Sequence, residues 1–166
     1  MRIALLTGGG DCPGLNAVIR AVVRRARNHR FEVVGLRDGW KGLIEDRVFP
    51  LTRENTAGIL HRGGTILGTS RVNPFTVEGA VDKVMSNAAR HGINAVVAIG
   101  GEGTLSAAAR LHEFGLPVVG IPKTIDNDLN GTDYTFGFDT AVSIATEAID
   151  RCTAPPSRTS GSSWWR

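Results

Sequence analysis

A short polar segment at residues 122–128 brings two carboxylates, a hydroxyl and an ammonium group together directly after an apolar run. The segment reads PKTIDND. Its acidic residues, Asp126 and Asp128, suit phosphoryl transfer to an alcohol. That reaction needs positioning, charge neutralisation and a carboxylate that accepts the hydroxyl proton. The segment alone leaves open a second interpretation, a solvated turn capped by aspartate.

Two glycine-rich loops each follow an apolar run and precede a helical pattern. Residues 7–16 read TGGGDCPGLN, and residues 100–104 read GGEGT. Glycine lets backbone N–H groups approach an anion, and the N-terminus of the following helix adds a favourable dipole. Glu102 offers a carboxylate for Mg²⁺, although a glutamate at a helix start is also an ordinary partner of the helix dipole. The first loop matches neither a Walker A nor the standard dinucleotide fingerprint, and a tight strand-to-helix turn is its alternative interpretation.

A third glycine-containing segment, residues 63–71, ends in an arginine. It reads GGTILGTSR. Arg71 could clamp a nucleotide phosphate with two parallel hydrogen bonds. A lone arginine after a turn is, however, more commonly just exposed.

The elements that must position these loops follow from the periodicity of apolar residues. Strands buried on both faces are expected at residues 3–7, 31–36, 94–99 and 117–121. Helical patterns are expected at residues 15–28, at 77–88, from 105, and at 138–151. This alternation predicts an α/β fold with a doubly wound, mostly parallel, Rossmann-like sheet and right-handed crossovers. The loops after residues 7, 99 and 121 should then meet at one edge of the sheet, where ligands bind.

Composition narrows the class of protein. The 166 residues fit one domain, and the net charge of +3 is a weak indication of small anionic ligands rather than nucleic acid. Two cysteines indicate no disulfide framework, and no apolar stretch is long enough for a membrane span. The four histidines lack metal-ligand spacing. We therefore expect a soluble, cytoplasmic protein.

Together these segments resemble the 6-phosphofructokinase family, whose members transfer phosphate to the 1-hydroxyl of fructose 6-phosphate in glycolysis. The resemblance runs from residue 1 to Arg151. PKTIDND is its most specific segment, since a glycine loop like GGEGT also occurs in NAD kinases and diacylglycerol kinases. The other matching stretches are GGDCPGLNAVIR, GGTILGTSR, AIGGEGT, the continuation DLNGTDYTFGFDTA, and EAIDR.

The resemblance implies a role for each matching residue. Asp126 would be the general base on the sugar hydroxyl, in a substrate-binding stretch made of Thr124, Ile125 and Asp126. Glu102 would take the Mg²⁺ position, where many relatives carry aspartate. The residues implied to hold ATP are Gly9, Arg71, Gly101, Gly103 and Thr104.

The phosphoryl donor is a separate question, on which two residues point in opposite directions. Gly103 resembles the ATP-dependent enzymes, because an aspartate there would crowd and repel the α-phosphate of a nucleotide. Lys123 resembles the pyrophosphate-dependent enzymes. We favour ATP as the donor and keep pyrophosphate as the alternative.

The resemblance also implies partners beyond the substrates. Full-length family members are expected to be homo-oligomers, tetramers or dimers. Arg20, Arg24 and Arg53 fall where bacterial relatives place an effector phosphate site between subunits. The alternative for these arginines is a solvated helix face. No nucleic-acid or membrane partner is expected.

The last residues, 152–166, do not resemble the family, whose members are about twice as long as this chain. They show no helical or strand period, and Pro155 and Pro156 should end the preceding helix. We expect residues 1–151 to be an incomplete family domain. We expect the residues after Arg151 to be a disordered tail that arose by a frameshift. Because the second lobe that grips the sugar phosphate is absent, the chain alone is expected to have little or no kinase activity. A non-catalytic nucleotide-binding module is the remaining alternative.

Overall fold

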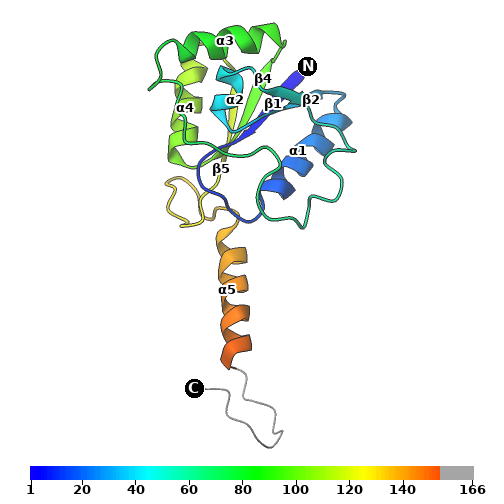
Figure 1. Ribbon diagram of the computed structural model, residues 1–166, viewed down its shortest axis with the longest axis vertical. Coiled ribbons are helices and arrows are strands. Elements are labelled where there is room, and N and C mark those ends of the chain that lie inside the picture. Colours follow the sequence, from blue (N-terminus) through cyan, green and yellow to red (C-terminus); the bar gives the residue numbers. More distant parts are fainter. Residues whose placement is uncertain (154–166) are drawn as a thin grey trace, which may run out of the picture.

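In the computed structural model, which describes residues 1–153, a five-stranded sheet lies between helices (Figure 1). The strands are β1 (Arg2–Thr7), β2 (Glu32–Leu36), β3 (Val48–Pro50), β4 (Ala95–Gly100) and β5 (Val118–Pro122). The helices are α1 (Leu15–Asn28), α2 (Trp40–Ile44), α3 (Ala80–Arg90), α4 (Glu102–Glu113) and α5 (Phe138–Thr153).

The sheet has the order β3-β2-β1-β4-β5. β1 is central and pairs in parallel with β2 and β4, β4 pairs in parallel with β5, and the short β3 runs antiparallel to β2. The predicted mostly parallel sheet is therefore confirmed. The carboxyl ends of β1, β4 and β5 lie at one edge, where the loops after them gather above the start of α5 (Figure 1).

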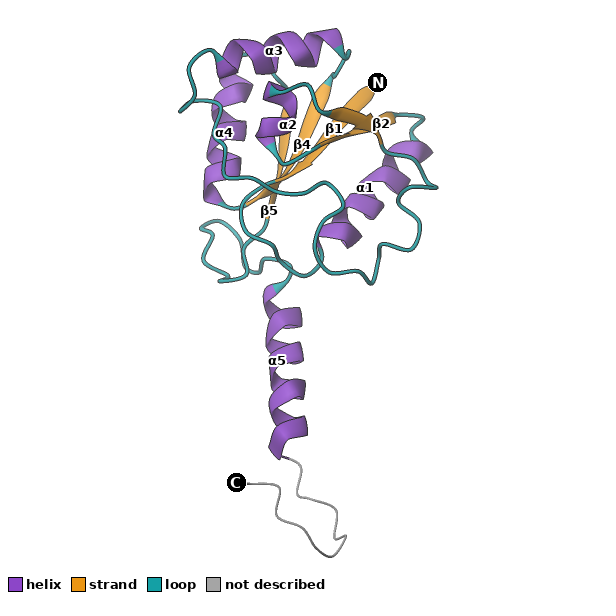
Figure 2. Cartoon of the chain, in the orientation of Figure 1, coloured by secondary structure: helices purple, strands orange, loops and turns teal. Residues whose placement is uncertain are grey.

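Two hydrophobic clusters, one on each face of the sheet, hold the layers together. Successive residues of β1 alternate between them: Ala4 and Leu6 pack with α2, α3 and α4, whereas Leu5 packs with α1. The resulting three layers can be followed in Figure 2. Helices on both faces are what makes the sheet doubly wound, as predicted.

The structure differs from the sequence expectations in several elements. β3 and α2 were not expected, and α3 begins at Ala80 rather than at residue 77. β3 has only three residues and α2 only five, so neither provides enough residues for a period to show. The helix predicted to end at Arg151 continues to Thr153, and the rest of the expected tail, 154–166, lies outside the described residues.

The prediction that all four expected strands are buried on both faces is wrong for β5. Its Val119 side chain is 59% exposed, and only its first residue and its last two are partly buried. β5 is the last strand of the sheet among residues 1–153, so it has one neighbouring strand, and the face that bears Val119 is open.

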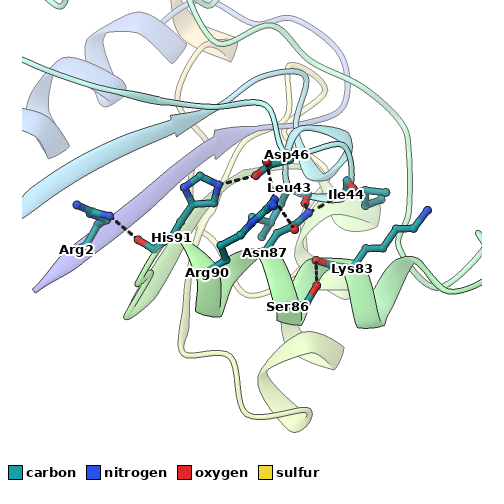
Figure 3. A network of polar contacts seen from close by, with 9 residues as sticks. All are labelled: Arg2, Leu43, Ile44, Asp46, Lys83, Ser86, Asn87, Arg90 and His91. Atoms are coloured by element: carbon teal, nitrogen blue, oxygen red, sulfur yellow. Dashed lines mark hydrogen bonds and ion pairs between the residues drawn. The ribbon is translucent and has the colours of Figure 1, made fainter.

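A polar network fastens α2 and α3 near the start of β1, where Arg2 donates to the carbonyl of His91 (Figure 3). The Asp46 carboxylate, just after α2, bonds both His91 and Arg90 at the end of α3. Asn87 donates from its amide to the carbonyls of Leu43 and Ile44 at 2.7 and 3.4 Å. These hydrogen bonds and ion pairs hold the last turn of α3 against the end of α2.

None of the helices formed by residues 1–153 is long and apolar enough to cross a membrane.

Candidate functional site

The first glycine loop leaves β1 and passes against the start of α4. The backbone N–H of Gly8 donates to the carbonyl of Ile99 at 2.9 Å, which ties the loop to β4. Gly8 and Gly100 both pack on Thr104, whose nearest side-chain atom would lie 2.4 Å from a Cβ at Gly8 and 2.5 Å from a Cβ at Gly100. Gly9 has a φ of +81°, a conformation that favours glycine. Glycine is therefore required here for close packing as well as for conformation.

The second loop forms the N-terminus of α4. Gly101 precedes the helix, and Glu102 and Gly103 open it with both residues exposed, whereas Thr104 is buried. The carbonyl of Gly101 accepts hydrogen bonds from the N–H groups of Thr104 and Leu105 at 3.1 and 3.0 Å. The earliest N–H groups of a helix have no partner within it, so this end of α4 presents donors and the positive end of the dipole.

A cavity of about 320 Å³ lies between these two loops and the segment that contains Arg71. All six residues expected to hold the phosphoryl donor and its metal line it. They are Gly9, Arg71, Gly101, Glu102, Gly103 and Thr104, joined by Ser70, Val72 and Asn73. Three stretches that are far apart in the sequence thus form one concave surface with an arginine, a carboxylate and a helix N-terminus.

The third loop, which follows β5, is fastened to the other two by Lys123. Its backbone N–H donates to the carbonyl of Gly100 at 2.9 Å, and its ammonium group donates to the carbonyl of Gly10. The side chain is 4% exposed. The sequence singled out Lys123 for donor choice, and the structure adds that it joins the three loops.

Hydrogen bonds fix the conformation of the loop around Thr124. Its hydroxyl donates to the Asp128 carboxylate at 2.9 Å and accepts from the backbone N–H of Asp126 at 3.3 Å. The buried hydroxyl of Thr135 donates to the Thr124 carbonyl at 2.7 Å. Asp126 and Ile125 are exposed, and neither lines the cavity described above. Asp126 is therefore available to a second reactant outside that cavity.

Cys12, in the first loop, is buried, and burial raises the pKa of its thiol. The positive charge of Lys123 opposes this shift, and the carboxylate of Asp11 adds to it. Its Sγ contacts the carbonyls of Pro13 and Phe136 at 3.5 and 3.3 Å. The raised pKa favours the un-ionised form of the thiol, which is the weaker nucleophile.

The arginines expected at an effector site are only partly brought together. Arg24 and Arg53 line a second cavity of about 870 Å³ between α1 and the β2–β3 edge, together with Arg27. Arg20 does not line this cavity. Its Nε is buried without a hydrogen-bond partner among the described residues.

The fold and the cavity together define an α/β protein with a concave site at the carboxyl edge of its sheet, lined by two glycine loops, an arginine and a carboxylate. The family model for phosphofructokinase matches residues 2–160. The chain belongs to the phosphofructokinase family.

Relatives of similar identity differ in the donor that their names give. The chain is 61% identical over 152 residues to a pyrophosphate–fructose 6-phosphate 1-phosphotransferase of Amycolatopsis mediterranei. That match covers 91% of this chain and 45% of the relative. It is 60% identical over 153 residues to an ATP-dependent 6-phosphofructokinase of Corynebacterium efficiens, a match that covers 91% of this chain and 44% of the relative. This chain thus spans about half the length of the curated relatives that it matches.

The solved structures give the same fold. The phosphofructokinase of Saccharomyces cerevisiae superposes with a TM-score of 0.85 at 32% identity, over 92% of this chain and 24% of that one.

Proposed function

We propose that this chain forms the donor-binding and base-bearing part of an enzyme that transfers a phosphoryl group from ATP to the 1-hydroxyl of fructose 6-phosphate. The observation that carries the proposal is the single cavity lined by Gly9, Arg71 and Glu102. Positioning and charge neutralisation are most of what phosphoryl transfer asks of a protein, and this cavity offers both.

The donor phosphates would lie between the first loop and the start of α4. Backbone N–H groups at Gly101 and Gly103 and the dipole of α4 attract negative charge there. The guanidinium of Arg71, which lines the same cavity, would bond phosphate oxygens with its fork of donors. Each of these groups acts on phosphates rather than on a base or a sugar.

Glu102 is suited to hold a Mg²⁺ ion that the donor phosphates also bind. Mg²⁺ commonly takes one or two carboxylates and keeps its other positions for phosphates and water, so a single exposed carboxylate beside a phosphate cradle fits. The ion would neutralise the charge that develops on the transferred group.

Asp126 would accept the proton of the sugar hydroxyl. Its carboxylate is exposed at the same edge of the sheet, and the hydrogen bonds around Thr124 hold its loop. Ile125 is 42% exposed beside it, and we assign Thr124, Ile125 and Asp126 to the substrate side.

ATP is favoured as the donor because a Cβ placed on Gly103 would meet no atom within 4 Å. The open space beside the helix start leaves room for the part of a nucleotide beyond the reacting phosphates. Pyrophosphate is the alternative, because Lys123 places a buried ammonium group within reach of the first loop and because the Amycolatopsis relative carries that donor in its name.

The donor-binding part should work without the rest of a full-length enzyme, whereas turnover should not. The residues that we assign to the donor lie between Gly9 and Thr104, whereas the chain covers under half of each relative. We therefore propose donor binding with little or no turnover by the 166-residue chain. Full-length assembly into a cytoplasmic homo-oligomer, and effector binding at Arg24 and Arg53, are proposed on the family resemblance.

The test has a binding arm and a turnover arm. Isothermal titration of the 166-residue chain with Mg-ATP and with Mg-pyrophosphate should show saturable binding, tighter for ATP. Residues 1–151 fused to the remaining half of the Amycolatopsis relative should phosphorylate fructose 6-phosphate in a coupled assay.

In that fusion, Asp126→Asn should lower kcat by about 10²- to 10⁴-fold, the range of a general base. Asp82→Asn, the same change at an exposed carboxylate in the first turn of α3, should leave kcat unchanged. Full activity of the Asp126→Asn fusion would contradict the assignment of the base. Binding by the chain without any turnover by the fusion would favour a non-catalytic nucleotide-binding module.

A further inference from the structure

Two buried threonine hydroxyls connect the end of β1 to the segment that leads to Arg71. Thr7 is the last residue of β1, and its side chain is 0% exposed. Its Oγ1 lies 2.9 Å from Oγ1 of Thr65 and 2.8 Å from the carbonyl oxygen of Gly68. The Oγ1 of Thr65 in turn accepts a bond from the backbone N–H of Leu67 at 3.1 Å.

The direction of every proton in this chain of bonds is determined. A carbonyl oxygen only accepts, so Thr7 must donate its single proton to Gly68. Thr65 must then donate its own proton to Thr7, while it accepts from Leu67. The order Leu67 N–H, Thr65 O–H, Thr7 O–H and Gly68 carbonyl uses each hydroxyl once as donor and once as acceptor.

These hydrogen bonds hold the first glycine loop alongside residues 65–71, the segment that ends at Arg71. Two residues after Thr7, the N–H of Gly9 donates to the carbonyl of Ser70 at 3.2 Å, two residues after Gly68. The two segments therefore run side by side, and the next residue, Arg71, enters the donor cavity beside Gly9. A shift between the segments would move the guanidinium relative to the glycine N–H groups.

We propose that Thr7 is a positioning residue for Arg71 and that it acts through Thr65 and Gly68. The inference rests on the proposed function, because it assigns Arg71 to the donor phosphates. Thr7 cannot contact the donor itself, since it is fully buried and does not line the cavity.

Thr7→Val tests the hydroxyl, because valine keeps the shape of threonine and removes only the hydrogen bonds. Mg-ATP and Mg-pyrophosphate affinities would be measured by isothermal titration of the 166-residue chain. We expect Thr7→Val to weaken donor binding about tenfold, the loss that corresponds to about one hydrogen bond. Thr7→Ser, which keeps the hydroxyl, should restore most of the affinity.

Combination with Arg71→Ala separates positioning from general destabilisation. If Thr7 acts through Arg71, Thr7→Val should weaken binding no further in the Arg71→Ala background. Thr56→Val is the matched control, because Thr56 is also buried, at 2% exposure, and its hydroxyl bonds the carbonyl of Thr52 away from the cavity. It should lower the melting temperature yet leave donor affinity unchanged.

Amide hydrogen exchange gives a second measurement that needs no ligand. Thr7→Val should raise the exchange rate of the Leu67 amide relative to amides within β1 and β4. Equal losses of donor affinity in Thr7→Val and Thr56→Val, or independent losses in the Thr7→Val and Arg71→Ala variants, would overturn the inference. A wild-type chain that binds neither donor would instead contradict the proposed function. Exchange that rises equally at Leu67 and within β1 and β4 in Thr7→Val would overturn the role of the hydroxyls.

Discussion

The cavity depends on the small size of its glycines as much as on the charge of Arg71 and Glu102. At Gly103 the absence of a side chain leaves the space beside the start of α4 open, and at Gly100 it lets Thr104 pack closely. These two glycines therefore have different tasks, one toward a ligand and one toward the protein. Substitutions separate the two tasks.

Gly103→Asp should change the donor preference without damage to the fold. A Cβ at this position meets no atom within 4 Å, and an acidic residue in the first turn of a helix is favourable. We expect the affinity for Mg-ATP to fall about tenfold or more, equivalent to about 1.4 kcal/mol, because the carboxylate crowds and repels the α-phosphate. Titration with both donors measures the effect, and pyrophosphate should lose less.

Gly103→Asn is the matched control for that change, since it has the same shape without the charge. A loss of ATP affinity in Gly103→Asp that Gly103→Asn does not share would assign the effect to repulsion. Equal losses of ATP and pyrophosphate affinity in Gly103→Asp would contradict the role of Gly103 in donor choice.

Gly100→Ala should lower the free energy of unfolding by about 1–3 kcal/mol, the typical cost of overpacking. The added Cβ would lie 2.5 Å from Cβ of Thr104, so β4 or α4 must shift. Gly10→Ala is the control, because a Cβ there meets nothing within 4 Å, and it should change stability by less than about 0.5 kcal/mol. Chemical denaturation of both variants gives the comparison, and similar stabilities would show that the contact with Thr104 is not restrictive.

At the scale of elements, the donor cradle depends on how firmly the helices are held to the sheet. α4 is held through Thr104 and the apolar cluster on its face of the sheet, whereas α2 and α3 are joined at their ends by the network around Asp46 (Figure 3). That network contains exposed charges, so its contribution should depend on pH.

Asp46 should make the protein more stable at neutral pH than at acid pH. Its hydrogen bond with His91 lowers the pKa of the Asp46 carboxyl below the ordinary value of 3.8, and the charge of Arg90 acts in the same direction. A lowered pKa in the folded state means that the contribution is present above the unfolded-state value and is lost as pH falls through the folded-state value. Stability should therefore begin to fall near pH 4 and continue to fall below it.

Melting temperatures of Asp46→Asn and the wild type from pH 7 to pH 3 test this dependence. The difference between the two proteins should be largest at neutral pH and should shrink below pH 4, because protonation removes the charge in the wild type as well. Asp133→Asn, at an exposed loop carboxylate, should follow the wild type at every pH. A constant difference between Asp46→Asn and the wild type would argue against the network as its source.

At the scale of the whole molecule, α5 extends away from the sheet layers (Figure 1). Nearly all of its residues are exposed, including Val142 at 48% and Ile149 at 62%. These two residues are seven positions apart and share one face of the helix. An uncovered apolar face of this kind favours association between molecules.

Val142→Lys combined with Ile149→Lys should reduce concentration-dependent self-association of the 166-residue chain. The melting temperature should hardly change, because both side chains are largely exposed and lysine is at least as good a helix former as valine or isoleucine. Sedimentation velocity over a range of concentrations provides the measurement. Thr140→Lys combined with Ser143→Lys adds the same charge at exposed polar positions of α5, and equal suppression by this control would assign the effect to charge alone.

The sequence by itself determined the local features of this protein. The Val/Ile/Leu runs and the helical period of residues 15–28 suffice for the parallel strands and for α1, because each pattern repeats within a few residues. The same holds for the candidate donor residues, since glycine loops and the PKTIDND segment carry their chemistry in consecutive positions.

The sequence predicted that the loops after residues 7, 99 and 121 meet, and only the tertiary structure decided that the segment with Arg71 joins them. Residues 9, 71 and 102 share a cavity because β1 and β4 are adjacent in the sheet and because the Thr7 and Thr65 hydroxyls hold the intervening segment against the first loop. The sequence likewise did not determine the open face of β5 or the burial of Lys123, because both depend on strand order and on contacts between distant residues. Sequence periodicity reports which side of an element is apolar, whereas the neighbour that covers that side is a property of the packed chain.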